Sequence, residues 1–147
     1  NAGFSLAGRV IEVATGKTYE AALQELVLGP LGLEHSYLNP ADVMTQRFVV
    51  GHNGPEVARP WPLTRCTYAA GALTSDVGDL LRYARFQMGD GSLADGTRLL
   101  DPASLAAMHT PQVTLWRGEH WGLGWSVDDT AGGRWVTAAP PTASGRS

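Results

Sequence analysis

The chain has little of several features that mark particular classes of protein. Its 147 residues include one cysteine, Cys66, so an internal disulfide is excluded and the redox compartment is left open. A formal net charge of -3 with mixed signs leaves no basic patch, which argues against a nucleic-acid partner. No apolar run is long enough to cross a bilayer, so we expect no membrane segment. The chain starts at Asn1 without a Met or a signal peptide, and we expect an interior-to-C-terminal piece of a longer protein.

Self-contained catalytic and metal-binding motifs are missing as well. The sequence has no Gly-x-Ser-x-Gly elbow and no glycine loop that would cradle a phosphate. Its four histidines lie far apart and show no metal-ligand spacing: His35, His52, His109 and His120. We therefore expect neither a metal nor another cofactor. His120, next to Trp121, is either a base or a histidine at the rim of a site, and the rim is the better interpretation.

What the chain does have is the composition and patterning of a globular protein. Residues 4–13 carry apolar side chains at helical spacing, and Gly16 ends this predicted helix. Thr18 is predicted to cap a second helix, which the Gly29-Pro30 pair stops. Residues 31–62 are rich in proline, glycine and asparagine, and only residues 47–50 among them read as a strand.

The second half of the chain predicts two more helices and then strands. Ser75 is predicted to cap a third helix, whose inward-facing residues would be Val77, Leu80, Leu81 and Ala84. Turns at residues 89–91 and 95–96 predict a short hairpin that ends at residues 99–100, and Asp101-Pro102 opens a helix through Met108. Residues 121–127 and 134–137 read as strands. Helices followed by a terminal pair of strands indicate an α+β fold.

Four segments, taken in order, resemble the class C β-lactamase and D-peptidase family. In that family a Tyr-x-Asn motif runs directly into a helix, a Pro-Leu-Gly turn follows the next helix, and Gly-Gly-Leu-x-Ser-Thr and Gly-Leu-Gly-Trp segments come later. The matching segments here are residues 1–12 with Thr15-Gly16-Lys17, residues 29–33, residues 69–75 with Asp79-Leu80, and residues 121–125. The resemblance implies an antiparallel sheet flanked by helices beside a helical region, of which this chain carries an incomplete part.

The resemblance implies acyl transfer through a serine ester. A Ser-x-x-Lys motif supplies the nucleophile in this family, and this chain contains neither that serine nor that lysine. Only Asn1 maps onto a catalytic motif, as the third residue of Tyr-x-Asn, where it would donate to the substrate amide and hold the lysine. The alternative for Asn1 is an ordinary helix N-cap. Ser75 is not the nucleophile, because Gly78 stands three places on.

The family's third motif, Val-Gly-His-Gly-Gly, is expected after Arg134 and is absent. Reading the last base of each codon with the first two of the next would give Gly from Trp135 and permits His-Gly-Gly afterwards. We therefore hypothesise a one-base frame shift near residues 134–135. The alternative is a divergent, proline-rich tail. The predicted organisation is a partial β-lactamase-related serine hydrolase domain over residues 1–138, followed by an irregular tail over residues 139–147.

The function implied by the resemblance is hydrolysis of a β-lactam, a D-amino-acid peptide or a small ester through a covalent acyl-enzyme. We expect a small-molecule or peptide substrate as partner, and we expect this chain alone to be inactive. The alternative is a catalytically inactive, penicillin-binding-like binding module. An intact upstream Ser-x-x-Lys would favour the enzyme. Substrate choice stays open at this point, because the pocket walls that select substrates lie largely in segments absent from the chain. Localisation stays open as well, because we expect the N-terminal part of the protein to be missing.

Overall fold

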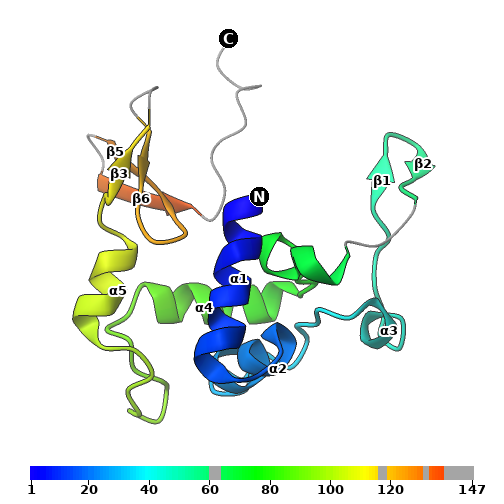
Figure 1. Ribbon diagram of the computed structural model, residues 1–147, viewed down its shortest axis with the longest axis horizontal. Coiled ribbons are helices and arrows are strands. Elements are labelled where there is room, and N and C mark those ends of the chain that lie inside the picture. The colour runs from blue at the N-terminus through cyan, green and yellow to red at the C-terminus, as the bar shows by residue number, and fades with distance from the viewer. Residues whose placement is uncertain (60–63, 116–118, 131–132, 138–147) are drawn as a thin grey trace. The chain divides into compact units, whose positions relative to one another are not determined.

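The computed structural model describes residues 1–59, 64–115, 119–130 and 133–137. The chain divides into two compact units, Asn1–Arg85 and Phe86–Ser147, and each is described by itself. Figure 1 shows the order of the elements along the chain. Within the described residues, no helix combines the length and the apolar character needed to cross a membrane.

The first unit opens with the two helices that the sequence predicts. Helix α1 spans Ala2–Thr15 and ends at Gly16, whose φ of 67° lets its N–H bond the carbonyl of Glu12. Helix α2 spans Tyr19–Leu23, and the Thr18 side chain caps it by accepting from the N–H of Ala21. The helix then widens into a π-helical turn, η1, over Gln24–Leu28, which the sequence does not predict.

The long irregular region carries short elements that differ from the predicted ones. Helix α3 spans Pro40–Val43 and is capped by the side chain of Asn39. Strands β1 (His52–Asn53) and β2 (Glu56–Val57) form a small antiparallel hairpin. The predicted strand at residues 47–50 is wrong. Val49 is 92% exposed, so its side chain gains none of the burial that favours a strand.

The third predicted helix is confirmed, but the side chains that it buries are not the predicted ones. A 3-10 helix, η2, spans Arg65–Ala70, and helix α4 spans Val77–Gln87. Leu80 and Leu81 are 55% and 52% exposed, and Val77 is also exposed, so their inward placement is wrong. The fully buried residue of this helix is Asp79. The cap differs too, because Asp76, not Ser75, accepts the N–H of Asp79.

The second unit begins with the predicted hairpin and helix. An isolated bridge pairs Ser92 with Arg98 around a turn at Gly96, whose φ is 83°. Helix α5 spans Pro102–Met108, and Asp101 caps it by accepting from the N–H groups of Ala103 and Ser104. The Asp-Pro signal in the sequence therefore predicts this helix start correctly.

A four-stranded antiparallel sheet completes the second unit. Its strands stand in sequence order: β3 (Val113–Thr114), β4 (His120–Trp121), β5 (Ser126–Thr130) and β6 (Gly133–Thr137). The predicted single strand over residues 121–127 is wrong, because a turn separates β4 from β5. In that turn the N–H of Gly122 donates to the carbonyl of Trp125. Gly122 also lies so close to α5 that an added Cβ would stand 1.9 Å from the carbonyl oxygen of Met108.

Each unit buries its own small set of apolar side chains. The buried apolar residues of the first unit are Ala22, Leu28, Leu33, Leu38 and Val43. Those of the second are Leu105 and Val127. Helices with small antiparallel sheets confirm the predicted α+β fold class.

Candidate functional site

Asn1, the one residue that the sequence maps onto a catalytic motif, stands at the N-cap of α1. Its backbone carbonyl accepts from the N–H groups of Phe4 and Ser5, at 3.1 and 3.2 Å. Its side chain is exposed and makes no capping hydrogen bond. The position is thus that of a helix cap, but the amide group does not perform the capping that usually selects asparagine there.

A buried carboxylate in one of the segments that carry the resemblance binds the loop that directly follows another. The Oδ2 atom of Asp79, on α4, accepts from the backbone N–H of His35 at 2.7 Å and from the hydroxyl of Ser36 at 2.8 Å. The Ser75 hydroxyl lies 2.8 Å from that of Ser36. Beside this cluster, Tyr37 and Thr74 exchange two backbone hydrogen bonds of 2.8 Å. The chain after the Pro-Leu-Gly turn is therefore fixed to the residues that precede α4.

The charge of Asp79 is balanced although its side chain is fully buried. Burial by itself would raise the pKa of Asp79, but hydrogen bonds from Ser36, His35 and Arg82, together with the Arg82 charge, hold that pKa below its usual value. Arg82 donates to Oδ1 of Asp79 at 2.8 Å and is itself half exposed. The carboxylate is thus a structural anion with all its partners supplied by the first unit.

The sequence pattern places Asp79 in a motif-like segment and predicts no role of its own for it. A signal for it exists, because Asp76 and Asp79 have the spacing of a helix cap and its third helical residue. In the usual arrangement the side chain at the third position turns back to the cap. Here it instead reaches His35 and Ser36, more than forty residues away in the sequence. Local pattern alone does not predict that partner.

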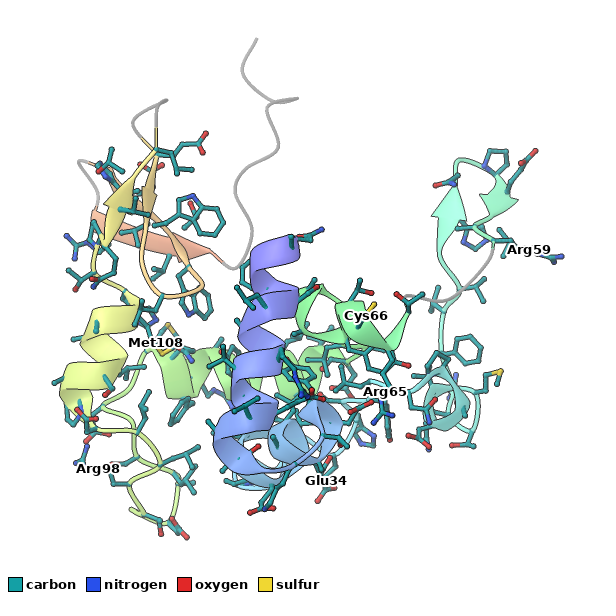
Figure 2. The ribbon with its side chains drawn as sticks, viewed as in Figure 1. Glu34, Arg59, Arg65, Cys66, Arg98 and Met108 are labelled. Carbon is teal, nitrogen blue, oxygen red and sulfur yellow. The ribbon has the colours of Figure 1, made fainter. Side chains whose placement is uncertain are left out.

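A groove of about 410 Å³ lies between α1 and η2 in the first unit. Gly8 and Ala69 both line it, and a Cβ added at Gly8 would stand 2.7 Å from the Cβ of Ala69. Arg65 forms a two-pronged ion pair with Glu20, with distances of 2.5 and 3.1 Å, and the hydrogen bond from Arg65 lowers the pKa of Glu20. Figure 2 shows Arg65 and its neighbour Cys66, which both line this groove.

Ser36, Ser75 and Cys66, which lie in or near these segments, have no lysine or histidine among their hydrogen-bond partners in the described part of the chain. Ser36 donates to the carboxylate of Asp79, and Ser75 bonds Ser36 and the carbonyl of Asp76. The Cys66 sulfur lies 3.2 Å from the hydroxyl of Thr64. A neighbouring lysine or histidine is the usual activating group of a serine or cysteine nucleophile, and these three residues lack one.

The histidines of the second unit have ordinary structural partners. His109 caps the end of α5, lies 2.9 Å from the Oε1 atom of Gln87 through Nε2, and meets Trp125 edge-on. Burial lowers the pKa of His109, which favours the neutral ring. The Nδ1 atom of His120 lies 2.9 Å from the hydroxyl of Thr114, its direct cross-strand neighbour in the sheet. Among the described residues, no group of three potential ligands could hold a metal ion.

The predicted position of the third motif falls at the edge of the described chain. Arg134 and Val136 belong to β6, which pairs with β5. Residues 138–147, which include the predicted tail, lie outside the described residues. The frame-shift hypothesis and the domain boundary at residue 138 therefore stay predictions.

Comparison with known proteins gives consistent matches over nearly the whole chain. A family model described as beta-lactamase matches residues 1–142. Penicillin-binding protein 4 of Amycolatopsis lactamdurans is 33% identical over 141 residues, which cover 88% of this chain and 37% of that protein. The octameric penicillin-binding protein homologue from Pyrococcus abyssi matches with a TM-score of 0.72 and 25% identity, covering 91% of this chain and 31% of that one. A class C beta-lactamase matches with a TM-score of 0.70 and 28% identity, covering 86% and 34%.

These matches also show how much of each related protein the chain spans. It spans only 31% to 37% of the length of these three proteins, although they cover 86% or more of it.

Proposed function

The chain belongs to the beta-lactamase family, and we propose that it forms part of a serine hydrolase that acts through a covalent acyl-enzyme. The family match confirms the resemblance predicted from the four segments, and the structural matches confirm the fold. The enzymes of this family are in general serine hydrolases. The proposed substrates are a β-lactam, a D-amino-acid peptide or a small ester.

The observation that carries the proposal is the arrangement around the start of α1. Asn1 opens that helix as the last residue of a Tyr-x-Asn motif would, and its amide group makes no capping hydrogen bond. The segment that resembles Gly-Gly-Leu-x-Ser-Thr begins at Ala69, which packs against Gly8 of the same helix. One motif-bearing segment therefore begins α1, and another, far away in the sequence, packs against the same helix.

In the proposed reaction a serine outside this chain attacks the carbonyl carbon of the substrate. A C–O bond forms, the C–N or C–O bond of the leaving group breaks, and the serine proton passes through the neighbouring Lys and Tyr to the leaving group. Water then hydrolyses the ester and releases the serine. Asn1 donates its amide N–H to the substrate and accepts from the lysine, so it orients both groups.

The 147 residues alone are expected to form no acyl-enzyme, because they lack the Ser-x-x-Lys motif. Incubating this chain with a fluorescent penicillin should leave it unlabelled, whereas the protein translated from the complete gene should be labelled one to one. Stoichiometric labelling of the 147 residues would reveal a nucleophile among them and contradict this account. An unlabelled complete protein that still binds penicillin would favour the inactive binding module.

The role of Asn1 can be separated from helix capping with a matched pair of variants of the complete protein. Asn1→Ala should lower turnover by roughly 10²–10³, the usual loss when one well-placed polar donor is removed. The control is Asn39→Ala, because Asn39 does cap its helix through Oδ1 at 3.1 Å. It should cost about 1 kcal/mol of stability and leave turnover nearly unchanged. Turnover of Asn1→Ala equal to that of the unaltered protein would show that the Asn1 amide takes no part in the reaction.

A further inference from the structure

The hairpin of β1 and β2 (Figure 1) carries a pair of residues that the proposed function does not use. Asn53 is the last residue of β1, and Gly54 and Pro55 form the turn that leads to β2. Gly54 has a φ of 59°, and the ring of Pro55 restricts that residue to a negative φ. These are features of a type II′ turn, which takes glycine at its first central position. The turn therefore explains Gly54 and gives the side chain of Asn53 no structural role.

Nothing in the described part of the chain shields or holds this pair of residues. All residues from 51 to 57 are exposed, and nothing lies within 4 Å of a Cβ built on Gly54. Among the described residues, neither the side-chain amide of Asn53 nor the backbone N–H of Gly54 takes part in a hydrogen bond. Strands β1 and β2 form a sheet of two strands, which is only marginally stable. The backbone around Asn53 can therefore change its conformation at little cost.

The other two asparagines of the chain differ in the residue that follows them. Asn39 precedes Pro40, which has no backbone N–H, and the Oδ1 atom of Asn39 accepts from the N–H of Ala41 at 3.1 Å. Asn1 precedes the first residue of α1, an alanine whose Cβ and helical backbone restrict the approach of its nitrogen. Glycine has no Cβ and permits close approach of its backbone. Asn53 is thus the asparagine whose side-chain carbonyl carbon the next backbone nitrogen can reach most easily.

We propose that Asn53 is a site of spontaneous deamidation through a cyclic succinimide. The backbone nitrogen of Gly54 bonds to Cγ of Asn53, the C–N bond of the side-chain amide breaks, and the amide nitrogen leaves as ammonia with the proton of the Gly54 N–H. Water then adds to one of the two carbonyl carbons of the ring and opens it. Addition at Cγ restores the ordinary backbone with an aspartate. Addition at the backbone carbonyl carbon leaves the chain running through the side chain, as isoaspartate.

Either product weakens the pairing of the hairpin. Asn53 lies directly opposite Glu56 in the register of β1 and β2. Both products place a carboxylate at residue 53, and like charges on directly opposite residues are destabilising. Isoaspartate also adds one methylene to the backbone of β1, which disturbs the alternation on which the register depends. The reaction therefore converts a neutral, paired residue into a charged one that pairs less well, and it does so without any hydrolase activity.

The test follows the folded protein, translated from the complete gene, during incubation for several weeks at neutral pH and physiological temperature. Trypsin releases a peptide of residues 48–65, in which Asn53 is the one asparagine and no glutamine occurs. The mass gained when OH replaces NH₂ in this peptide therefore reports Asn53 alone. Fragmentation of the peptide should show both aspartate and isoaspartate. Asn1 and Asn39 are internal controls and should be modified about tenfold less or not at all.

Asn53→Gln is the matched variant. It keeps the side-chain amide but adds a methylene, so attack by the Gly54 nitrogen would have to close a six-membered ring in place of a five-membered one. Modification of residues 48–65 should fall by about tenfold or more. Asn53→Asp tests the effect on pairing. Hydrogen exchange at Ala58, whose N–H donates to the carbonyl of Gly51 at 2.8 Å, should be roughly two- to fivefold faster in Asn53→Asp than in Asn53→Gln.

Three results would overturn the proposal. The first is an unmodified Asn53 in the folded protein under conditions in which a synthetic peptide of residues 48–65 does react, since the hairpin would then be held or covered. The second is modification of Asn39 as fast as that of Asn53, and the third is undiminished modification in Asn53→Gln. Equal exchange at Ala58 in the two variants would reject the weakened pairing.

Failure of this proposal and failure of the proposed function give different results. A complete protein that deamidates at Asn53 but never reacts with penicillin would keep the modification site and reject the hydrolase. A complete protein that reacts with penicillin and retains an unmodified Asn53 would keep the hydrolase and reject the modification site.

Discussion

The contacts that hold each unit together differ between the two units in how far apart along the sequence their partners lie. In the first unit, Asp79 binds His35 and Ser36, and Arg65 pairs with Glu20 across 45 residues. In the second unit most of the aspartate contacts are local. Each of Asp90, Asp95 and Asp101 accepts an N–H from the residue two places on.

This difference shows how far the structure of each unit depends on neighbouring residues or on distant ones. An aspartate that accepts from a nearby N–H forms a turn or cap that a short peptide segment already favours. An aspartate buried against a distant loop is stable only when the loop arrives with its own donors in place. We therefore expect single substitutions to have wide effects in the first unit. In the second unit their effects should stay near the altered residue, except where backbone approaches backbone.

The largest effect is expected from Asp79→Ala. The change removes the carboxylate that accepts from the N–H of His35, the hydroxyl of Ser36 and the guanidinium of Arg82. A buried donor left without its acceptor costs roughly 1–3 kcal/mol, and this change removes the acceptor of three donors at once, of which Arg82 is half exposed. Hydrogen exchange should show loss of protection throughout α4 and residues 33–38. Asp95→Ala in the second unit is the control, and its effect should be confined to residues 93–97; equally wide losses would remove the contrast between the units.

The next largest effect is expected from Gly122→Ala in the second unit. The new Cβ would stand 1.9 Å from the carbonyl oxygen of Met108, so the β4–β5 turn must move away from α5. Overpacking of this kind costs roughly 1–3 kcal/mol. Exchange at the N–H of Leu123, which donates to Met108 at 3.1 Å, should increase.

Gly124→Ala is the control for that change. Nothing lies within 4 Å of a Cβ there, so its cost comes only from the positive φ of 82°. The N–H of Leu123 should keep its protection in this variant. If both variants release Leu123 equally, the contact between backbone segments is not what fixes the turn.

The smallest and most gradual effect is expected from acid. The pKa of Asp79 is held below its ordinary value, so its contribution to stability is complete above the unfolded pKa of about 3.9 and is lost as the pH falls towards the folded value. The opening free energy at His35, from exchange rates corrected for pH, should therefore fall below about pH 4. Asp79→Asn should remove most of this dependence, and Asp101→Asn should leave it in place.

The sequence predicted those parts of the fold that depend on neighbouring residues. Gly16 at the end of α1, Thr18 before α2 and Asp101-Pro102 before α5 were all predicted in position. Each acts through backbone groups within four residues, so its effect is the same in any surrounding fold. The order of four motif-like segments likewise predicted the family before any contact was known.

The failed predictions have a shared cause. Residues 47–50 and 121–127 have the composition of strands, and Leu80 and Leu81 have the spacing of a buried helix face. Pairing and burial depend on residues from elsewhere in the fold: Val49, Leu80 and Leu81 are exposed among the described residues, and a turn interrupts residues 121–127. In the candidate site, Asn1 was found from its motif, whereas the role of Asp79 needed the position of a loop more than forty residues away.

The sequence by itself determined the helix ends, the α+β class and the family of this protein, because short-range backbone chemistry and motif order are written along the chain. Tertiary structure alone decided that Asp79 would be buried in place of its apolar neighbours, and that Gly122 would meet the backbone of Met108. It also decided that α1 would leave Leu6, Val10 and Val13 open. The physical reason is that burial is a property of two surfaces, and a sequence pattern describes one of them.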